Sequence, residues 1–196
     1  MRKGGDILKS ALIISSGEKN TAYLTDILKN ACYDKIATVS TAGEARRILI
    51  ENDYDLYIVN APLPDEQGTK LSENIATKGI GGVILIVKAD YFEQVCEKVE
   101  NYGVITVTKP VNRSILWNAI KLSAAASNRM QMMQHENEKL LNKIEDIRIV
   151  ARAKCLLISY LSMSEEQAHR YIEKQAMDLR ITKRAVADKI LKTYDN

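Results

Sequence analysis

Residues 83–87 read Val-Ile-Leu-Ile-Val, five consecutive aliphatic side chains near the middle of the chain. Four of the five are β-branched, and a run without a polar residue is typical of a strand that is buried on both faces. Apolar residues at helical spacing precede this run at Thr69–Lys78 and follow it at Tyr91–Tyr102. The stretch therefore predicts a central strand of a parallel sheet between two helices.

The same alternation of strand and helix extends in both directions from this run. The predicted strands are residues 11–15, 35–39, 55–59, 83–87 and 104–108, and the predicted helices are residues 21–31, 42–52, 69–78, 91–102 and 113 onward. Five strands that alternate with five helices predict a parallel sheet covered on both faces. We therefore predict an α/β, flavodoxin-like (CheY-like), five-stranded, doubly wound domain, with its functional crevice at the carboxyl ends of the strands.

The composition changes after residue 110, since all nine glycines and all three prolines lie at or before Pro110. Continuous helix is therefore expected from Val111 onward, and a heptad repeat appears within it. Its a and d positions are Met130, Met133, Asn137, Leu140, Ile144, Ile147 and Ala151. A single Asn at an a position is a device that fixes the register of a two-stranded coil. We predict a coiled-coil homodimer; the alternative is an amphipathic helix that packs on its own domain.

The last stretch, Ile149–Asn196, predicts three short helices that pack on one another. Ser164 and Gln167 form a capping-box pattern, and Thr182 is a second candidate N-cap. The expected core residues are Leu157, Leu161, Tyr171, Ile172, Val186 and Ile190, with Ala153, Ala168, Ala176 and Ala187 where helices approach closely. The predicted organisation is a domain over 1–124, a coiled-coil linker helix over 125–148 and a three-helix domain over 149–196.

Residues 8–124 resemble the receiver domain of bacterial response regulators. The resemblance rests on Tyr54-Asp55-Leu56 at a strand entry, Pro62-Leu63-Pro64 in the next loop, Gly68 before a helix and Lys109-Pro110 after the fifth strand. It implies an acidic pair after the first strand, a phosphoacceptor Asp after the third and a Ser or Thr after the fourth. In such a domain the carboxylates hold Mg²⁺ and the Asp attacks the phosphoryl donor.

The sequence departs from the receiver pattern at these positions. Ser15 and Ser16 stand in place of the acidic pair, Asn60 in place of the phosphoacceptor and Lys88 in place of the hydroxyl, so that only Lys109 remains. An amide is a poor nucleophile and cannot form an acyl phosphate. We therefore interpret the domain as a pseudo-receiver with a degenerate phosphorylation site. Its remaining roles are a protein–protein platform or a crevice for another ligand, such as an anion attracted by the two lysines.

Residues from about 136 to 196 resemble the ANTAR domain, a three-helix RNA-binding module of bacterial antiterminators. The matching residues are Arg152-Ala153-Lys154, Leu157, Ser164-Glu165-Glu166-Gln167-Ala168, Ala176-Met177-Asp178 and Val186-Ala187. The resemblance implies that two such modules hold paired hairpins in a nascent mRNA leader, so that polymerase reads through. The small residues of the match are expected in the core and not in the RNA interface.

RNA contact is expected from polar residues outside that core. The densest group is Arg180, Thr182, Lys183 and Arg184, at the turn into the last helix, where free N–H groups also favour phosphate. Arg152, Lys154, Lys174 and Lys189 are further candidates. Residues 125–196 contain 13 Lys+Arg and 10 Asp+Glu, which accounts for the net charge of +3. The alternative interpretation is a set of solvated charges with partners on their own helices.

Other classes of site find little support in the sequence. The three cysteines are widely spaced, which favours free buried thiols in predicted helices, and His135 and His169 have no metal-binding pattern around them. No motif of an enzyme is present, and no cofactor is expected. We expect a regulator without catalytic activity; a DNA-binding transcription factor and a non-catalytic signalling adaptor are the alternatives.

The location of the protein is also constrained by its sequence. No apolar run approaches the roughly 20 residues that a membrane span requires. The first ten residues, MRKGGDILKS, lack the apolar segment of a secretory signal and are expected to be a short leader. We therefore expect a cytoplasmic protein with no membrane association, whose partners are RNA hairpins, a second copy of the chain and a regulatory protein.

Overall fold

The computed structural model describes residues 9–79 and 81–194. The chain divides into two compact units, Met1–Met132 and Met133–Asn196. The first strand begins at Lys9, so most of the expected leader lies outside the described residues. The three-part division into 1–124, 125–148 and 149–196 stays a prediction.

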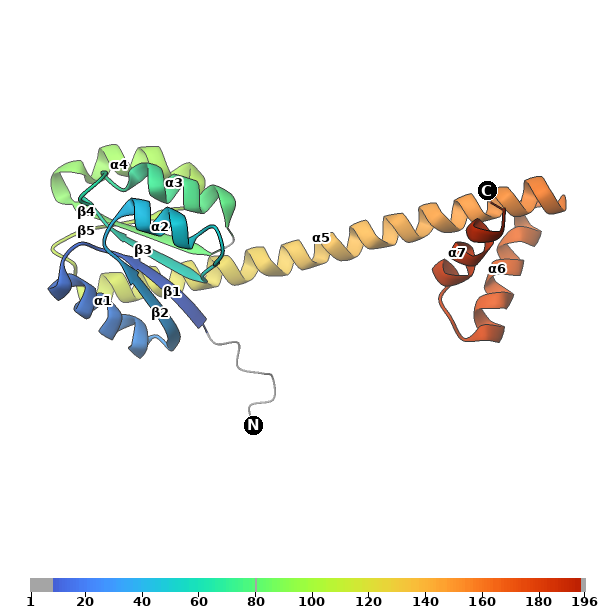
Figure 1. Cartoon of the computed structure of the whole chain (residues 1–196), viewed down its shortest axis with the longest axis horizontal. Coiled ribbons are helices and arrows are strands. Elements are labelled where there is room, and N and C mark those ends of the chain that lie inside the picture. The colour runs from blue at the N-terminus through green and yellow to red at the C-terminus, as the bar shows by residue number, and fades with distance from the viewer. Residues whose placement is uncertain (1–8, 80, 195–196) are drawn as a thin grey trace. The chain divides into compact units, whose positions relative to one another are not determined.

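The first unit is a parallel α/β sheet with helices on both faces, as predicted (Figure 1). Its strands are β1 (Lys9–Ile14), β2 (Tyr33–Val39), β3 (Leu56–Asn60), β4 (Gly82–Lys88) and β5 (Ile105–Lys109). Its helices are α1 (Glu18–Asn30), α2 (Ala42–Ile48), α3 (Thr69–Lys78), α4 (Phe92–Val99) and the first part of α5 (Arg113–Leu161). The strand order is β2-β1-β3-β4-β5, and each neighbouring pair is parallel. The predicted fold class is confirmed.

Alternate residues of each strand supply two separate cores. In β1, Ala11 and Ile13 pack on the face that α1 and the start of α5 cover, together with Leu24 and Leu116. Leu12 and Ile14 point to the opposite face, where α2, α3 and α4 lie (Figure 1). Because the central strands are buried on both faces, their polar positions are confined to the strand ends, where the candidate site lies.

Two helices are shorter than the sequence predicted. The helix expected over 42–52 ends at Ile48, and Ile50 is 81% exposed. Beyond Leu49, which packs against the core, residues 50–53 are exposed, so tertiary packing does not extend the helix. The helix expected over 91–102 is broken into a 3₁₀ turn (Ala89–Tyr91), α4 and a second 3₁₀ turn (Glu100–Tyr102).

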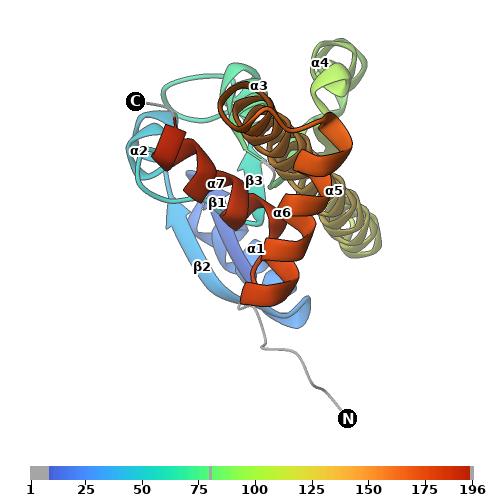
Figure 2. The ribbon, with the colours of Figure 1, turned by 90° about the vertical axis from the view of Figure 1, so that its right-hand side faces the viewer.

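The second unit contains the remainder of α5 with α6 (Glu165–Leu179) and α7 (Lys183–Tyr194). Figure 2 shows α6 and α7 lying against each other. One core joins the three helices, and the small residues predicted for close approach, Ala153, Ala168, Ala176 and Ala187, are all buried in it. Leu157, Ile172, Val186 and Ile190 fill the same core, as predicted.

Specific caps define the turns of this unit. The hydroxyl of Ser164 accepts from the Gln167 N–H, and the Gln167 side chain accepts from the Ser164 N–H at 2.8 Å, which confirms the predicted capping box. The Thr182 hydroxyl accepts from the Ala185 N–H at 3.2 Å, as expected of an N-cap. Between these helices, Arg180 adopts a left-handed conformation with φ 53°, which ends α6 and turns the chain.

Four residues that were expected to be buried are exposed. Leu161 and Tyr171 were expected in the core of the second unit, yet they are 45% and 40% exposed. The cysteines were expected to be buried and helical, but Cys32 and Cys155 are exposed, and Cys32 lies in a turn with φ 63°.

Within residues 9–79 and 81–194, no helix is long and apolar enough to cross a membrane.

Candidate functional site

The carboxyl ends of β1 and β3 are joined by a buried pair of neutral side chains. The amide nitrogen of Asn60 donates a 3.0 Å hydrogen bond to the hydroxyl of Ser15. Both residues are almost fully buried, at 6% and 5% exposed. Ser16, by contrast, is exposed. The structure therefore brings Asn60 together with one of the two serines that replace the acidic pair.

Lysines occupy the ends of the next two strands. Lys88 and Lys109 are paired in the register of β4 and β5, and the Lys109 ammonium donates to the Ala61 carbonyl oxygen. Partial burial lowers the pKa of Lys109, and the nearby charge of Lys88 lowers it further. Lys109 and Asn60 also line a common cavity of about 260 Å³. The predicted proximity of the two cations is confirmed.

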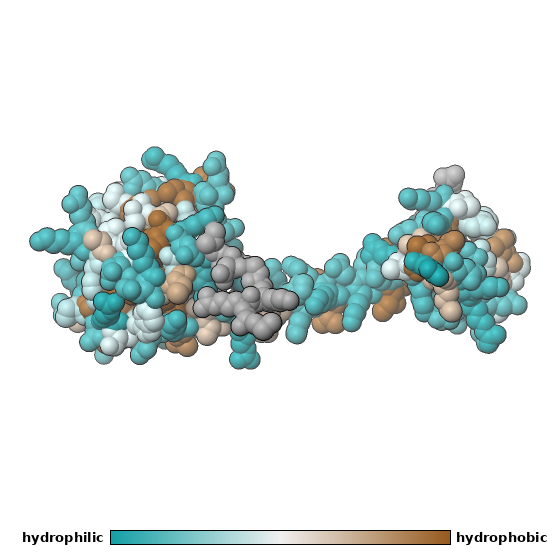
Figure 3. Space-filling model, turned by 90° about the horizontal axis from the view of Figure 1, so that it is seen from below, coloured by the Kyte–Doolittle hydropathy of each residue, from teal (hydrophilic) through white to brown (hydrophobic). Residues whose placement is uncertain are grey.

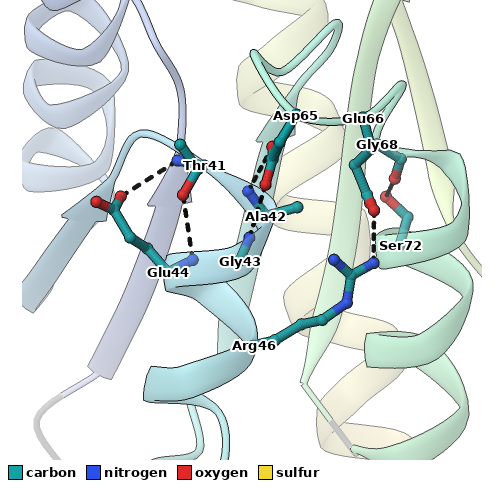
Figure 4. Close-up of polar contacts among 9 residues, drawn as sticks. All are labelled: Thr41, Ala42, Gly43, Glu44, Arg46, Asp65, Glu66, Gly68 and Ser72. Carbon is teal, nitrogen blue, oxygen red and sulfur yellow. Dashed lines mark hydrogen bonds and ion pairs between the residues drawn. The ribbon is translucent and has the colours of Figure 1, made fainter.

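The loop after β3 is tied to the start of α2 by a carboxylate (Figure 4). The two side-chain oxygens of Asp65 accept from the N–H groups of Ala42 and Gly43, each at 2.9 Å. These hydrogen bonds lower the pKa of Asp65. In the same loop Glu66 pairs with Arg46 at 2.6 Å. Asp65 and Glu66 therefore both connect the loop after β3 to helix α2.

A Mg²⁺ ion of the kind found in receivers does not fit this end of the sheet. The ion prefers carboxylate oxygens, but the buried side chains here are a hydroxyl and an amide that satisfy each other. Lys109 lines a cavity together with Asn60, and its ammonium would repel a cation there. Among the residues that the structure describes, no cluster of three or more His, Cys, Asp or Glu side chains could hold a metal ion.

In the second unit, several of the predicted RNA-contact residues meet around one hollow. It has a volume of about 380 Å³ and lies among α5, α6 and α7. Its polar lining comes from Asp146, Lys154, His169, Thr182, Lys183 and Arg184. We call this the basic hollow. Residues from three separate stretches of sequence thus converge, four of them among the eight predicted.

Each long cation of the basic hollow has a carboxylate partner. Lys154 pairs with Glu165 at 2.7 Å, Lys183 with Glu173 at 2.5 Å and Arg184 with Asp146 at 2.6 Å. Sequence reasoning missed these acids, because the partners lie 11, 10 and 38 positions apart. Only the tertiary packing of the helices reveals them.

The other four predicted RNA-contact residues lie outside the lining of the basic hollow. Lys174, Arg180 and Lys189 are exposed, and their side chains make no ion pair with any described residue. Arg152 is exposed and interacts within the chain. Four of the eight predicted RNA-contact residues therefore cluster at the basic hollow, and the other four lie outside its lining.

The predicted a and d positions of α5 form an exposed apolar stripe. Met130, Met133, Leu140, Ile144 and Ile147 are between 57% and 69% exposed. Figure 3 shows hydrophobic side chains on the surface of this part of the helix. Asn137 is exposed within the same stripe. Such a stripe at heptad spacing is the face that a coiled coil would cover.

The geometry agrees with comparisons to known proteins. The response regulator receiver domain family matches residues 11–121, and the chain belongs to this family. The ANTAR domain matches residues 138–191, so the chain combines a receiver domain with an ANTAR domain. It is 27% identical over 171 residues to the transcriptional regulatory protein PdtaR of Mycobacterium tuberculosis, covering 87% of this chain and 83% of the relative.

Solved structures support the fold of the first unit. The signal receiver domain of an HD domain-containing protein from Pseudomonas fluorescens Pf-5 aligns with a TM-score of 0.58 and 21% identity, covering 67% of this chain and 97% of that one. A CheY-like receiver domain protein from Methanospirillum hungatei JF-1 aligns with a TM-score of 0.56 and 24% identity, covering 63% and 98%. At these identities the likeness concerns the fold alone.

Proposed function

We propose that this chain is an RNA-binding transcription antitermination regulator that acts as a homodimer in the cytoplasm, without catalytic activity. Its second unit holds hairpins of a nascent mRNA leader, and its first unit responds to a partner or ligand in place of phosphorylation. The observation that carries the proposal is the convergence of Lys154, Thr182, Lys183 and Arg184 on the basic hollow of an ANTAR domain.

The ion pairs of the basic hollow are compatible with binding to phosphate. Lys183 and Arg184 remain 50% and 40% exposed in their pairs. Exposed ion pairs contribute only about 0–1 kcal/mol, so exchange of a carboxylate for an RNA phosphate costs little. Arginine also forms bidentate hydrogen bonds with phosphate, which favours Arg184 as an anchor.

The exposed stripe of α5 supports the dimer. Five large apolar side chains recur at a and d spacing, and none of them enters a core of its own unit. A second copy would cover them with the same stripe, with Asn137 facing its counterpart and fixing the register. Such a dimer presents two ANTAR domains, which suits an RNA with two hairpins.

The absence of phosphorylation at Asn60 follows from its chemistry. The side chain is an amide, buried against Ser15, and none of the described residues that line its cavity is a carboxylate that could hold Mg²⁺. We therefore propose a non-covalent input to the first unit. A regulatory protein or a small ligand can supply it by binding one state of the protein better than another.

Binding to a hairpin RNA tests this function. In fluorescence anisotropy the intact protein is expected to bind a labelled two-hairpin RNA, with an affinity that falls steeply as salt rises. Lys183→Glu/Arg184→Glu should weaken binding by about tenfold or more and flatten the salt dependence. Lys19→Glu, an exposed charge reversal in the first unit, serves as the control.

Competition separates the alternatives. Unlabelled duplex DNA should compete much less well than unlabelled hairpin RNA. Preference for the duplex would replace the proposal with a DNA-binding function. Failure to bind either nucleic acid, with the fold intact by circular dichroism, would favour a signalling adaptor.

A further inference from the structure

A second hollow in the first unit lies between α3 and α4, beside the carboxyl ends of β3 and β4. Its volume of about 720 Å³ falls in the range of small-molecule sites, about 300–1,000 Å³. Residues of the β3–α3 loop, of α3 and of the segment 87–98 line it. We call it the α3–α4 hollow. The basic hollow lies in the other unit and shares no residue with it.

Three lysines line the α3–α4 hollow without a carboxylate partner. Lys70, Lys88 and Lys98 are exposed and make no ion pair or side-chain hydrogen bond within residues 9–79 and 81–194. Of the two acids in the lining, Glu66 is engaged by Arg46, which leaves Glu73 alone against three positive charges. The cations of the basic hollow, in contrast, are all paired. The net field of the α3–α4 hollow therefore favours an anion.

The backbone at one side of this hollow adds to the same field. Gly68 precedes α3 with φ +83°, and a Cβ there would lie 3.0 Å from the side chain of Val59. Helix α3 has no side-chain cap, and no described group accepts from the N–H groups of Thr69 and Lys70. Figure 4 shows Gly68 and Ser72 at this end of the helix. Uncapped N–H groups next to the three lysines reinforce the preference for a phosphate.

An aromatic ring and two amides complete the lining. Tyr91 is 57% exposed, so its ring is available to a planar group. Gln67 and Gln94 offer amide donors and acceptors to the edge of such a group. Nucleic acid bases stack on exposed aromatic rings of this kind. The α3–α4 hollow therefore offers lysines that can bind a phosphate and an aromatic ring that can stack on a base.

We propose that the α3–α4 hollow binds a nucleotide, with its phosphates on Lys70, Lys88 and Lys98 and its base against Tyr91. The site is distinct from the RNA interface and does not depend on it. Lys88 also ends β4 beside Lys109, so the bound phosphate neutralises a charge at the same crevice that contains Asn60. The ligand thus reaches the end of the sheet where a receiver takes its phosphoryl group.

Isothermal titration calorimetry on the full chain tests this site with four nucleoside diphosphates, ADP, GDP, CDP and UDP, as probes. At least one is expected to bind saturably, pyrophosphate more weakly, and the matching nucleoside without phosphate at least about tenfold more weakly. Lys88→Glu/Lys98→Glu should reduce nucleotide affinity by about tenfold or more. Tyr91→Ala should reduce nucleotide affinity about threefold or more and leave pyrophosphate binding unchanged.

Matched variants locate the binding. Lys19→Glu and Lys183→Glu/Arg184→Glu should leave nucleotide affinity unchanged, since neither changes the α3–α4 hollow. Lys70→Gln and Lys88→Gln replace the double variant if circular dichroism shows that it does not fold.

Three results would overturn the proposal. The first is that no nucleotide binds saturably at millimolar concentration. The second is that Lys19→Glu and Lys88→Glu/Lys98→Glu lose nucleotide affinity equally. The third is that pyrophosphate binds as tightly as the nucleotide and that Tyr91→Ala leaves nucleotide affinity unchanged. RNA binding is measured separately on the same samples, so failure of either idea leaves the other standing.

Discussion

The side-chain amide of Asn60 donates a hydrogen bond to the Ser15 hydroxyl, and the two residues are 45 positions apart in the chain. Both are buried. Ser15→Ala should lower the free energy of unfolding by about 1–3 kcal/mol, because the Asn60 amide loses its partner in a buried site. Ser16→Ala, at the exposed neighbouring position, should change it by less than about 0.5 kcal/mol. Urea unfolding followed by circular dichroism measures both; equal effects would contradict the prediction.

Incubation with Mg²⁺ and acetyl phosphate should leave the intact mass of the protein unchanged, because an amide cannot form an acyl phosphate. Asn60→Asp alone should remain nearly inert, since Ser15 and Ser16 provide no carboxylate for the metal. Mass spectrometry reports the result, with a receiver domain that retains its aspartate as the positive control. A phosphorylated wild-type protein would refute the pseudo-receiver interpretation.

Asp65 should make the stability of the first unit depend on pH. The N–H groups of Ala42 and Gly43 lower the pKa of Asp65 in the folded protein. A lowered folded pKa contributes stability above the unfolded value, about 3.9, and that stability is lost as pH falls through the folded pKa. Asp65→Ala should therefore be less stable than wild type at pH 7, and the gap should narrow below about pH 4. Asp34→Asn is the control, and a gap that is constant with pH would contradict the prediction.

Glu173 should compete with RNA for Lys183. Their ion pair lies at the edge of the basic hollow, and the Lys183 hydrogen bond lowers the pKa of Glu173. Glu173→Gln should therefore raise hairpin affinity about two- to fivefold, in line with the small free energy of an exposed pair. Glu166→Gln, which breaks an exposed pair with Arg170 outside the hollow, should not. Weaker binding by Glu173→Gln would show that the pair positions Lys183 for contact.

The apolar stripe of α5 should hold two copies together. Leu140→Glu places a charge at a d position and should shift the protein to a monomer in sedimentation equilibrium. Lys139→Glu changes an exposed neighbour outside the stripe and should leave the dimer intact. A monomeric wild-type protein would rule out the coil.

The sheet was predictable because its signal is local. The run Val83–Val87 has no polar residue, and its burial on both faces follows from that alone. Helix ends were less predictable, as at Ile48, because the end depends on whether the next turn finds a core to pack against. The exposure of Leu161 and Tyr171 has the same origin: helical spacing places a residue on a helix, but the neighbouring helices decide which side is covered.

Some residues of the candidate sites could likewise be predicted from the sequence, and others could not. The resemblance to receiver domains singled out Ser15, Asn60 and Lys109, and parallel strands that end at one edge bring these positions together. The partners Glu165, Glu173 and Asp146 could not, because their pairing depends on how three helices pack. The α3–α4 hollow was also missed, since Lys70 and Lys98 look like ordinary solvated charges in the sequence.

The amide at position 60 also affects the duration of a signal, because it cannot store the signal as an acyl phosphate. An aspartyl phosphate is a chemical record that persists after the kinase has left and decays at the rate of its hydrolysis. Asn60, buried against Ser15, keeps no such record. If the input is the bound ligand or partner that we propose, a stimulus would last only while that molecule stays bound, and the response would follow its concentration with a delay set by its dissociation rate.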